Sequence, residues 1–450
     1  MKKEYLIREK PLKALVIFAL PMMLGNLFQQ FYNMADSVVV GQYVSEQALA
    51  AVGASYALTT VFISIAIGGG MGASVMAGLY FGAREYGKLR ASVRTALLTF
   101  LLLSIVLGMI GLICSRQLML LLNTPEDVLD QATEYLNIYF MGLPFLFMYN
   151  VLSALFNALG RSRTPLFLLI FSSVFNIGLD IYLVCRLELG VAGVAWATLI
   201  AQGISAVAAF LLFLREMKKY RTETACSWFD RKELFSMTRV ALPSILQQST
   251  VSIGMLLVQS VVNSFGAEML AGYSAGSRIE SLCIVPMAAM GNAISAFTAQ
   301  NIGARQYERV KQGYHAAYGI VFGFAVLIGL TLELFYRPLI FLFLGEEGTL
   351  LAAQTGGDYL RFLGWFFALI GLKMITDGLL RGSGDMKMFT IANLVNLGIR
   401  VLTAFILTPV FGISMVWVAV PVGWLANYLI SFAEYRTGAW RKAGEKKLAA

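Results

Sequence analysis

Twelve long apolar stretches constrain this chain more than any other feature of its sequence. A transmembrane helix needs about 20 mostly apolar residues, whereas a transmembrane strand has about ten of alternating polarity. Each stretch is long and uniformly apolar, so we predict an all-α polytopic membrane protein with 12 transmembrane helices. The stretches run roughly over residues 14–42, 49–80, 92–119, 132–159, 164–186, 190–215, 238–266, 271–300, 313–344, 357–381, 387–410 and 412–435.

The composition supports the same class. Hydrophobic residues make up 58% of the chain and charged residues 14%, against about 45–50% and about 25% in soluble domains. Basic residues before the first stretch resemble the start of a signal peptide. However, the apolar run continues through Pro21 without a small-residue cleavage site, so we expect a retained helix.

The basic residues predict an orientation. In the twelve-helix arrangement, 28 of the 35 Lys and Arg lie on one side, and only Arg116, Arg186, Arg337 and Arg361 lie on the other. Cytoplasmic loops carry the Lys and Arg excess. We therefore expect a multi-pass protein of the cytoplasmic membrane with both termini in the cytoplasm. The net charge of +9 is then an orientation signal and does not indicate nucleic-acid binding.

The chain also repeats itself. "FGAREYGKLR" begins at Phe81 and "IGARQYERVK" at Ile302, while "ALP" occurs at 19–21 and again at 241–243. A duplicated unit of six helices explains these offsets, and an even number makes the two repeats parallel, as in many secondary transporters. The arginine of the repeated decapeptide is expected to anchor the topology and cap a helix end.

We therefore expect three parts. An N-terminal lobe of six helices covers residues 1–215, a cytoplasmic linker covers 216–237, and a C-terminal lobe of six helices covers 238–450.

Polar residues inside the apolar stretches of the first lobe are candidates for function, because such residues are costly in a membrane. Asp36 lies in the first stretch, Asn176 and Asp180 in the fifth, and Thr198 in the sixth. At ~1.5 Å per residue, all four lie ~8–15 Å from the outer ends of their helices. Carboxylate, amide and hydroxyl oxygens suit a hard cation, and paired carboxylates also favour a proton. The alternative is that each aspartate is structural and paired with a basic residue.

Other ionisable residues in the spans indicate local pairs. Arg278 and Glu280 lie two residues apart in the eighth stretch, and we expect a structural pair there. Lys373 and Asp377 lie four residues apart in the tenth, where a helix brings them onto one face as an ion pair.

Two sequences resemble enzyme motifs, but neither has the surrounding structure or partner residues that the chemistry needs. "GYSAG" at 272–276 matches a nucleophile motif that requires a strand–turn–helix, yet it begins an apolar stretch. "GSGD" at 382–385 resembles an intramembrane protease motif, but its Tyr-Asp partner occurs nowhere in the chain. There is no ATP-binding loop and no paired cysteine spacing. We expect no enzyme activity, no cofactor and no metal beyond a coupling Na⁺.

Taken together, these sequences resemble the multidrug and toxic compound extrusion (MATE) family over essentially the whole chain. The resemblance is carried by "ALPMMLGNLFQQFYNMADSVVVG", "FNIGLDIYLV", "LGVAGVAWATLIAQ", the duplicated "GAR.Y" and "LLRGSGDMK". It implies two six-helix bundles around a V-shaped central cavity. It also implies export of organic cations or drugs driven by inward Na⁺ or H⁺, with either ion open.

The resemblance also assigns residues. DinF-like and related prokaryotic branches carry a cation site in the first lobe, and its positions match Asp36, Asn176, Asp180 and Thr198. Pro21 matches the proline about which the first helix of the family bends. The substrate cavity is expected to include Tyr32, Gln30 and Met22. The acid that the NorM-type branch carries on its seventh helix is absent here, so a second cation site of that kind is not expected.

Other functions with similar architecture are less consistent with the residues. A flippase or exporter of a lipid-linked or other amphiphilic metabolite would carry more cationic residues inside its spans than Arg278, Lys373 and Arg400. A major-facilitator carrier would have a different loop after its second helix. We expect a small cationic amphiphile and membrane lipid as partners, no nucleic acid, and a monomer.

Overall fold

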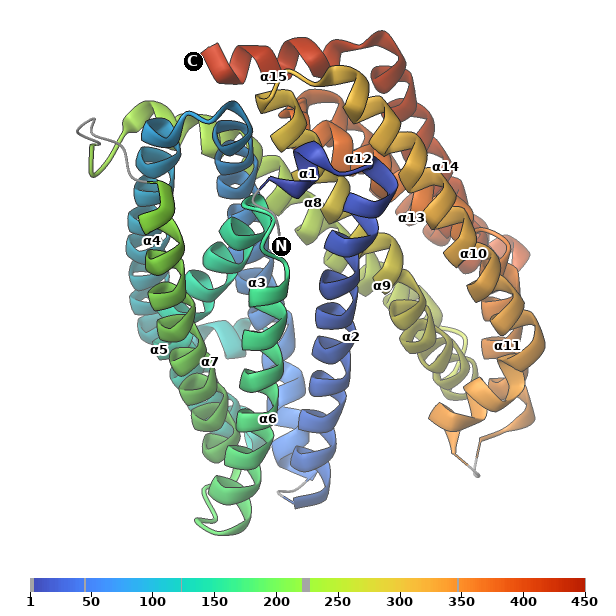
Figure 1. Ribbon diagram of the computed structural model, residues 1–450. Helices are drawn as coiled ribbons and strands as arrows, with labels where there is room; N and C mark the ends of the chain where they lie inside the picture. Colours follow the sequence, from blue (N-terminus) through green and yellow to red (C-terminus); the bar gives the residue numbers. More distant parts are fainter. Residues whose placement is uncertain (1–3, 44–45, 123, 221–226, 346–347, 450) are drawn as a thin grey trace. The chain divides into compact units, whose positions relative to one another are not determined.

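The computed structural model describes residues 4–43, 46–122, 124–220, 227–345 and 348–449, and side chains at 33–49, 57 and 449 fall outside that description. In the described residues every regular element is a helix (Figure 1). In chain order the elements are α1 (Tyr5–Arg8), α2 (Pro11–Tyr43), α3 (Glu46–Ala83), α4 (Tyr86–Leu121), α5 (Glu126–Ala158), α6 (Arg163–Cys185), α7 (Gly190–Met217), the 3₁₀ turn η1 (Lys218–Tyr220), α8 (Arg231–Asn263), α9 (Ala267–Gly303), α10 (Tyr307–Leu344), α11 (Leu350–Gly364), α12 (Phe367–Ser383), α13 (Met386–Phe411), α14 (Ser414–Thr437) and α15 (Ala439–Ala449).

These helices confirm the predicted fold class. Among the described residues, 11 helices are long and apolar enough to cross a membrane, or 12 if α11 and α12 form one bent span. The tenth predicted span, 357–381, needs correction, because it begins in α11 and ends in α12, which differ in direction by 57°. The break is a tight turn in which the amide of Phe366 donates to the carbonyl of Leu363 at 2.8 Å. Mean hydropathy does not register such a turn, because the residues on both sides are apolar.

The described residues divide into two compact units. Residues 24–245 form the N-terminal unit, and residues 1–23 together with 246–450 form the C-terminal unit. Each boundary lies inside a long helix, two residues beyond Pro21 in α2 and two beyond Pro243 in α8. Proline removes one backbone hydrogen bond of a helix, so these are the positions where α2 and α8 bend most easily. The lobes and linker expected from the repeat stay a prediction.

Close helix packing holds the N-terminal unit together. A Cβ on Gly108 of α4 would lie 2.8 Å from the backbone oxygen of Phe140 in α5. A Cβ on Gly70 of α3 would lie 3.3 Å from the backbone oxygen of Asn150, also in α5. Small residues allow such approach in membranes, where packing replaces the hydrophobic effect between helices.

The C-terminal unit uses the same device between α9 and α12. A Cβ on Gly378 would overlap the backbone carbonyl of Gly291. A Cβ on Gly291 would lie 2.7 Å from the backbone oxygen of Met374. Backbone atoms cannot rotate out of the way as side chains can, so α9 and α12 pack this closely only with glycine at the contact.

The repeated decapeptide forms the same helix end in both units. Arg84 follows α3 with φ 59° and Arg305 follows α9 with φ 58°, both in the left-handed region. In each copy the next amide donates to the carbonyl five positions earlier, at 3.0 and 2.7 Å. This is the Schellman arrangement, which satisfies carbonyls at a helix C-terminus. The repeat therefore encodes a specific turn, which both copies adopt although neither has glycine at the left-handed position.

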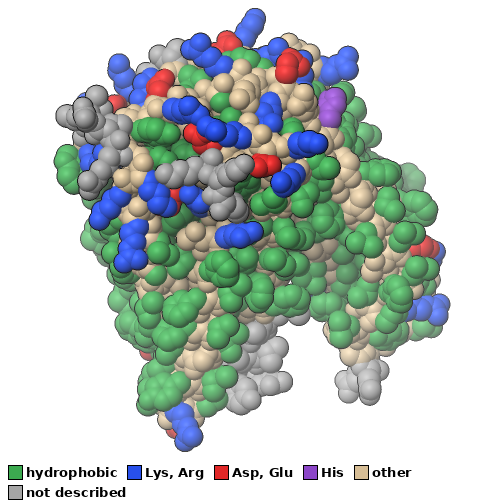
Figure 2. Space-filling view, in the orientation of Figure 1, with side chains coloured by type: hydrophobic (Ala, Val, Ile, Leu, Met, Phe, Trp, Pro, Cys, Tyr) green, Lys and Arg blue, Asp and Glu red, His purple; other side chains and the backbone are tan. Residues whose placement is uncertain are grey.

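The surface of the N-terminal unit has a polar end and an apolar flank. On the face shown in Figure 2, its Lys and Arg side chains gather at the end that carries the turn between α3 and α4, and hydrophobic side chains cover the flank. Exposed apolar side chains on α4 include Leu102 at 62% and Ile113 at 77%. Such a flank suits contact with acyl chains.

Candidate functional site

Two of the predicted site residues face the interior of the N-terminal unit from α6. The side chains of Asn176 and Asp180 are 2% and 0% exposed. They lie four residues apart, so one helix face carries both. Val174 and Ile181 on other faces of α6 are 67% and 48% exposed. The helix turns its polar residues inward because hydrocarbon cannot solvate them.

The third predicted residue, Thr198 of α7, lies in contact with Asn176. Asn176 Nδ2 lies 3.5 Å from Thr198 Oγ1, at the limit of a hydrogen bond. Exchanging the nitrogen and oxygen of the Asn176 amide gives three better contacts. The nitrogen then donates to Asp180 Oδ2 and Tyr32 Oη, and the oxygen accepts from the Thr198 backbone amide, each at 3.0 Å. We assign this orientation because it satisfies both ends of the amide.

Residues from three helices thus form one polar cluster, which we define as Tyr32, Asn176, Asp180 and Thr198. Asn176 and Asp180 are buried, and Tyr32 and Thr198 are partly buried. Tyr32 comes from α2, Asn176 and Asp180 from α6, and Thr198 from α7. Asn176 occupies the centre, since its amide contacts the other three residues. The cluster presents a carboxylate, an amide, a phenol and a hydroxyl, an oxygen-rich set that suits Na⁺ or a proton.

Asp36 is the fourth residue predicted for this site. Its backbone lies in α2, but its side chain falls outside the described residues. It follows Tyr32 by four residues, and such spacing places two residues on the same helix face. Its participation in the cluster stays a prediction.

A small cavity adjoins the cluster at Thr198. Its volume is about 10 Å³, and its lining includes Tyr135, Tyr139 and Gln202. The Tyr139 hydroxyl donates to the backbone oxygen of Thr59 at 3.2 Å. This volume is close to the minimum for one water-sized species.

The residues predicted for the substrate cavity do not all fall in one unit. Gln30 and Tyr32 belong to the N-terminal unit, and Met22 to the C-terminal unit. Tyr32 is the one that the structure brings to the polar cluster. Pro21 lies inside α2, which is helical on both sides of it.

The C-terminal unit contains a second buried polar network. Lys373 Nζ lies 3.0 Å from Asp377 Oδ2, which confirms the predicted ion pair. Asn393 accepts from Lys373 at 3.2 Å and donates to Asp377 at 3.3 Å. Gln247 and Ser431 donate to the same carboxylate at 3.4 and 3.0 Å. Asn393 and Ser431 were not predicted from the sequence, although the presence of a polar residue inside an apolar stretch indicates both.

The predicted pair of Arg278 and Glu280 is wrong. Glu280 is 6% exposed and accepts a hydrogen bond from the Tyr359 hydroxyl, whereas Arg278 is exposed. Residues two apart lie on nearly opposite faces of a helix, so they do not meet. In the described part of the chain, no group of three or more His, Cys, Asp and Glu residues lies close enough to hold a metal ion.

The fold and the polar cluster together define a polytopic helical membrane protein built from two repeats, with ionisable groups enclosed between its helices. The chain belongs to the MatE family, whose model matches residues 21–182 and 243–406. This family consists of transporters, so the protein is not an enzyme.

Similar proteins cover the whole chain. It is 29% identical over 444 residues to the "Probable multidrug resistance protein YoeA" of Bacillus subtilis, covering 96% of this chain and 94% of that protein. It is 29% identical over 432 residues to "Probable multidrug resistance protein YpnP" of the same organism, covering 96% of each. A solved structure described as the outward-facing conformation of a multidrug resistance MATE family transporter has a TM-score of 0.89 at 25% identity, covering 98% of this chain and 99% of that one.

Proposed function

We propose that this protein is a secondary active antiporter that exports organic cations and drugs across the cytoplasmic membrane, driven by inward movement of Na⁺ or H⁺. Family membership and the names of its relatives support drug export. The observation that carries the ion coupling is the polar cluster in the N-terminal unit, where Asn176 contacts Asp180, Tyr32 and Thr198 at depth in the bundle. A flippase function is less consistent with these residues, because it would need free cationic groups inside the spans. Lys373, one of three basic residues there, is neutralised by Asp377.

The Asn176 amide supplies a way to respond to the ion. With its nitrogen toward Asp180, it donates a hydrogen bond to a charged carboxylate. A bound Na⁺, or a proton on Asp180, makes an oxygen the better neighbour, because both need an acceptor or ligand. Turning the amide places its oxygen beside Asp180 and Tyr32, and moves its nitrogen toward Thr198. Occupancy would therefore exchange the hydrogen bond to Tyr32 on α2 for a different contact.

This exchange links the ion to α2. Tyr32 lies eleven residues beyond Pro21, and the boundary between the compact units falls between the two, after residue 23. A ligand shifts an equilibrium by the difference in its affinity for two shapes. Ion binding that alters contacts of Tyr32 would favour one shape of α2 over another, and so favour release or binding of the drug.

Transport should follow an imposed ion gradient without ATP. Ethidium movement would be measured in membrane vesicles under separate Na⁺ and H⁺ gradients, with protein abundance measured in parallel. Asp180→Asn is expected to abolish gradient-driven transport, Asn176→Ala to weaken its ion dependence, and Thr198→Ala to weaken it less. Asp130→Asn is the matched control, since its carboxylate is 83% exposed in the same unit. Unchanged ion coupling in Asp180→Asn would refute the assignment of the cluster.

The orientation is a separate part of the proposal. Labelling of single cysteines in a cysteine-free variant is expected to place positions 88 and 219 in the cytoplasm and positions 46 and 347 outside. Labelling of position 46 from the cytoplasm would contradict it.

A further inference from the structure

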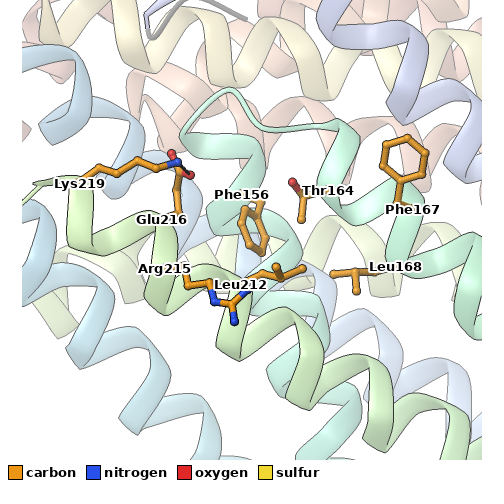
Figure 3. A pocket seen from close by; sticks show the side chains of 8 residues that line it. All are labelled: Phe156, Thr164, Phe167, Leu168, Leu212, Arg215, Glu216 and Lys219. Atoms are coloured by element: carbon orange, nitrogen blue, oxygen red, sulfur yellow. Dashed lines mark hydrogen bonds and ion pairs between the residues drawn. The ribbon is translucent and has the colours of Figure 1, made fainter.

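A second cavity of the N-terminal unit lies well away from the polar cluster. It has a volume of about 450 Å³ and lies where α5 ends, α6 begins and α7 ends (Figure 3). Thr164 on its wall lies twelve residues before Asn176 on α6, ~18 Å along the helix axis. The volume is within the range of pockets that hold small molecules, about 300–1,000 Å³.

One side of this cavity is apolar and open. Phe156 and Leu168 line it and are buried at 2% and 8% exposure. Phe167 and Leu212 also line it and are 67% and 39% exposed. The cavity therefore opens onto the apolar surface of the unit, where a bound molecule could extend a hydrocarbon chain over Phe167 and Leu212.

The other side is basic. Arg215 at the end of α7 and Lys219 in η1 line it, four residues apart, together with Glu216. Thr164 of α6 also lines the cavity and carries a hydroxyl. Glu216 already has partners, since Arg161 lies 3.1 Å from its carboxylate and Lys219 forms a close ion pair with it. Among the described residues the side chain of Arg215 has no hydrogen bond or ion pair, and Figure 3 shows its guanidinium directed away from Glu216.

The charges around the cavity do not balance. Arg215 and Lys219 line the cavity, and Arg161 lies beside it against Glu216, whose carboxylate is the single acidic group among these four residues, which leaves an excess of two positive charges. An organic cation would be repelled there, so this cavity is not suited to the transported drugs. An anion with an apolar part is complementary to both sides.

We propose that this cavity binds an anionic phospholipid, with its phosphate against Arg215, Lys219 and the Thr164 hydroxyl and an acyl chain along Phe167 and Leu212. Basic pockets between membrane helices on the cytoplasmic side take anionic headgroups. The choice of the cytoplasmic leaflet rests on the proposed orientation, whereas the binding itself does not depend on transport. Bound lipid would bridge α6 and α7, the two helices that carry Asn176, Asp180 and Thr198.

The test is lipid binding measured by native mass spectrometry of the full-length protein in detergent. The probes are dioleoyl phosphatidylglycerol, dioleoyl phosphatidylcholine and free glycerol phosphate, each titrated separately. Arg215→Gln is expected to weaken phosphatidylglycerol binding about tenfold, the effect of losing one hydrogen bond to a charged group. Lys218→Gln is the matched control, because Lys218 is exposed beside the cavity without lining it. The lipid affinity of this variant should stay within about twofold of the wild type, because solvent screens an exposed charge that does not contact the headgroup.

A double-mutant cycle separates a specific site from general attraction. If Thr164 and Arg215 contact one headgroup, the effects of Thr164→Val and Arg215→Gln will not add. Equal losses in Arg215→Gln and Lys218→Gln would overturn the proposal, as would equal affinity for phosphatidylcholine. Binding of free glycerol phosphate as tight as that of the lipid would also overturn it, since the acyl chain would then contribute nothing. None of these outcomes depends on whether the protein transports ions or drugs.

Discussion

Replacing Asp180 by Asn tests the central part of the proposed mechanism through stability as well as transport. The side chain keeps its shape and loses its charge. Asp180 is fully buried and hydrogen-bonded to Asn176 at 3.0 Å. A monovalent cation about 4 Å from this carboxylate gains ~4 kcal/mol at an effective dielectric constant of about 20. Losing this electrostatic attraction weakens cation binding by about a thousandfold.

This loss has a measurable consequence. A cation present at 100 times its dissociation constant stabilises the folded state by about 2.7 kcal/mol. After a thousandfold loss of affinity, the same concentration stabilises it by less than about 0.1 kcal/mol. Na⁺ or acidic pH, whichever supplies the coupling ion, should therefore raise the unfolding temperature of the wild type more than that of Asp180→Asn.

The assay is thermal unfolding in detergent, with NaCl replaced by choline chloride at constant ionic strength, and separately at pH 6 and pH 8. The variant Asp130→Asn should behave as the wild type does, because its carboxylate is exposed. If Asp180→Asn keeps the full ion-dependent rise in unfolding temperature, the ion does not bind at Asp180 and the cluster is structural.

Three further predictions concern packing and charge in the C-terminal unit. Gly378→Ala should destabilise the protein by about 1–3 kcal/mol in denaturant unfolding, because the new methyl group overlaps the backbone of α9. Gly398→Ala is the control and should be neutral or stabilising, since no heavy atom lies within 4 Å of the new carbon. Lys373→Met should lower the free energy of unfolding by about 3–5 kcal/mol, because it leaves the buried Asp377 carboxylate without its ion pair. Adding Asp377→Leu should recover most of this stability, and failure of the double variant to do so would contradict this account. Burial and a neighbouring glutamate raise the pKa of Asp385 to about 6, so the folded state binds its proton more tightly than the unfolded chain does. The contribution of Asp385 to the free energy of unfolding should fall by about 1 kcal/mol, after allowance for solvent screening, as pH rises from about 4 through 6. The variant Asp385→Asn should lack this pH dependence.

The helices could be predicted closely from the sequence. Each apolar stretch except the tenth corresponds to one helix in the structure, because length and hydropathy largely decide whether a segment can cross a membrane. The bend between α11 and α12 could not be predicted this way. No proline marks it, and the residues around Trp365 are as apolar as those of a continuous helix.

Part of the candidate site was also accessible. The spacing of Asn176 and Asp180 placed them on one helix face, and their polarity inside an apolar stretch indicated burial, which the structure bears out at 2% and 0% exposure. The same reasoning failed for Glu280, because its true partner, Tyr359, lies 79 residues away on α11. Local spacing predicts partners on the same helix and says nothing of partners on another.

The sequence by itself determined the all-helical membrane class, the duplication and the identity of the polar residues that must be kept from lipid. Only the tertiary structure decided that Tyr32 of α2 and Thr198 of α7 both meet Asn176 of α6, and that Arg215 and Lys219 line an apolar cavity. The physical reason is that the burial of a helix face depends on the residues of that helix. Which two faces meet depends on the tilt and rotation of both helices, and these are set by packing contacts such as Gly108 against Phe140.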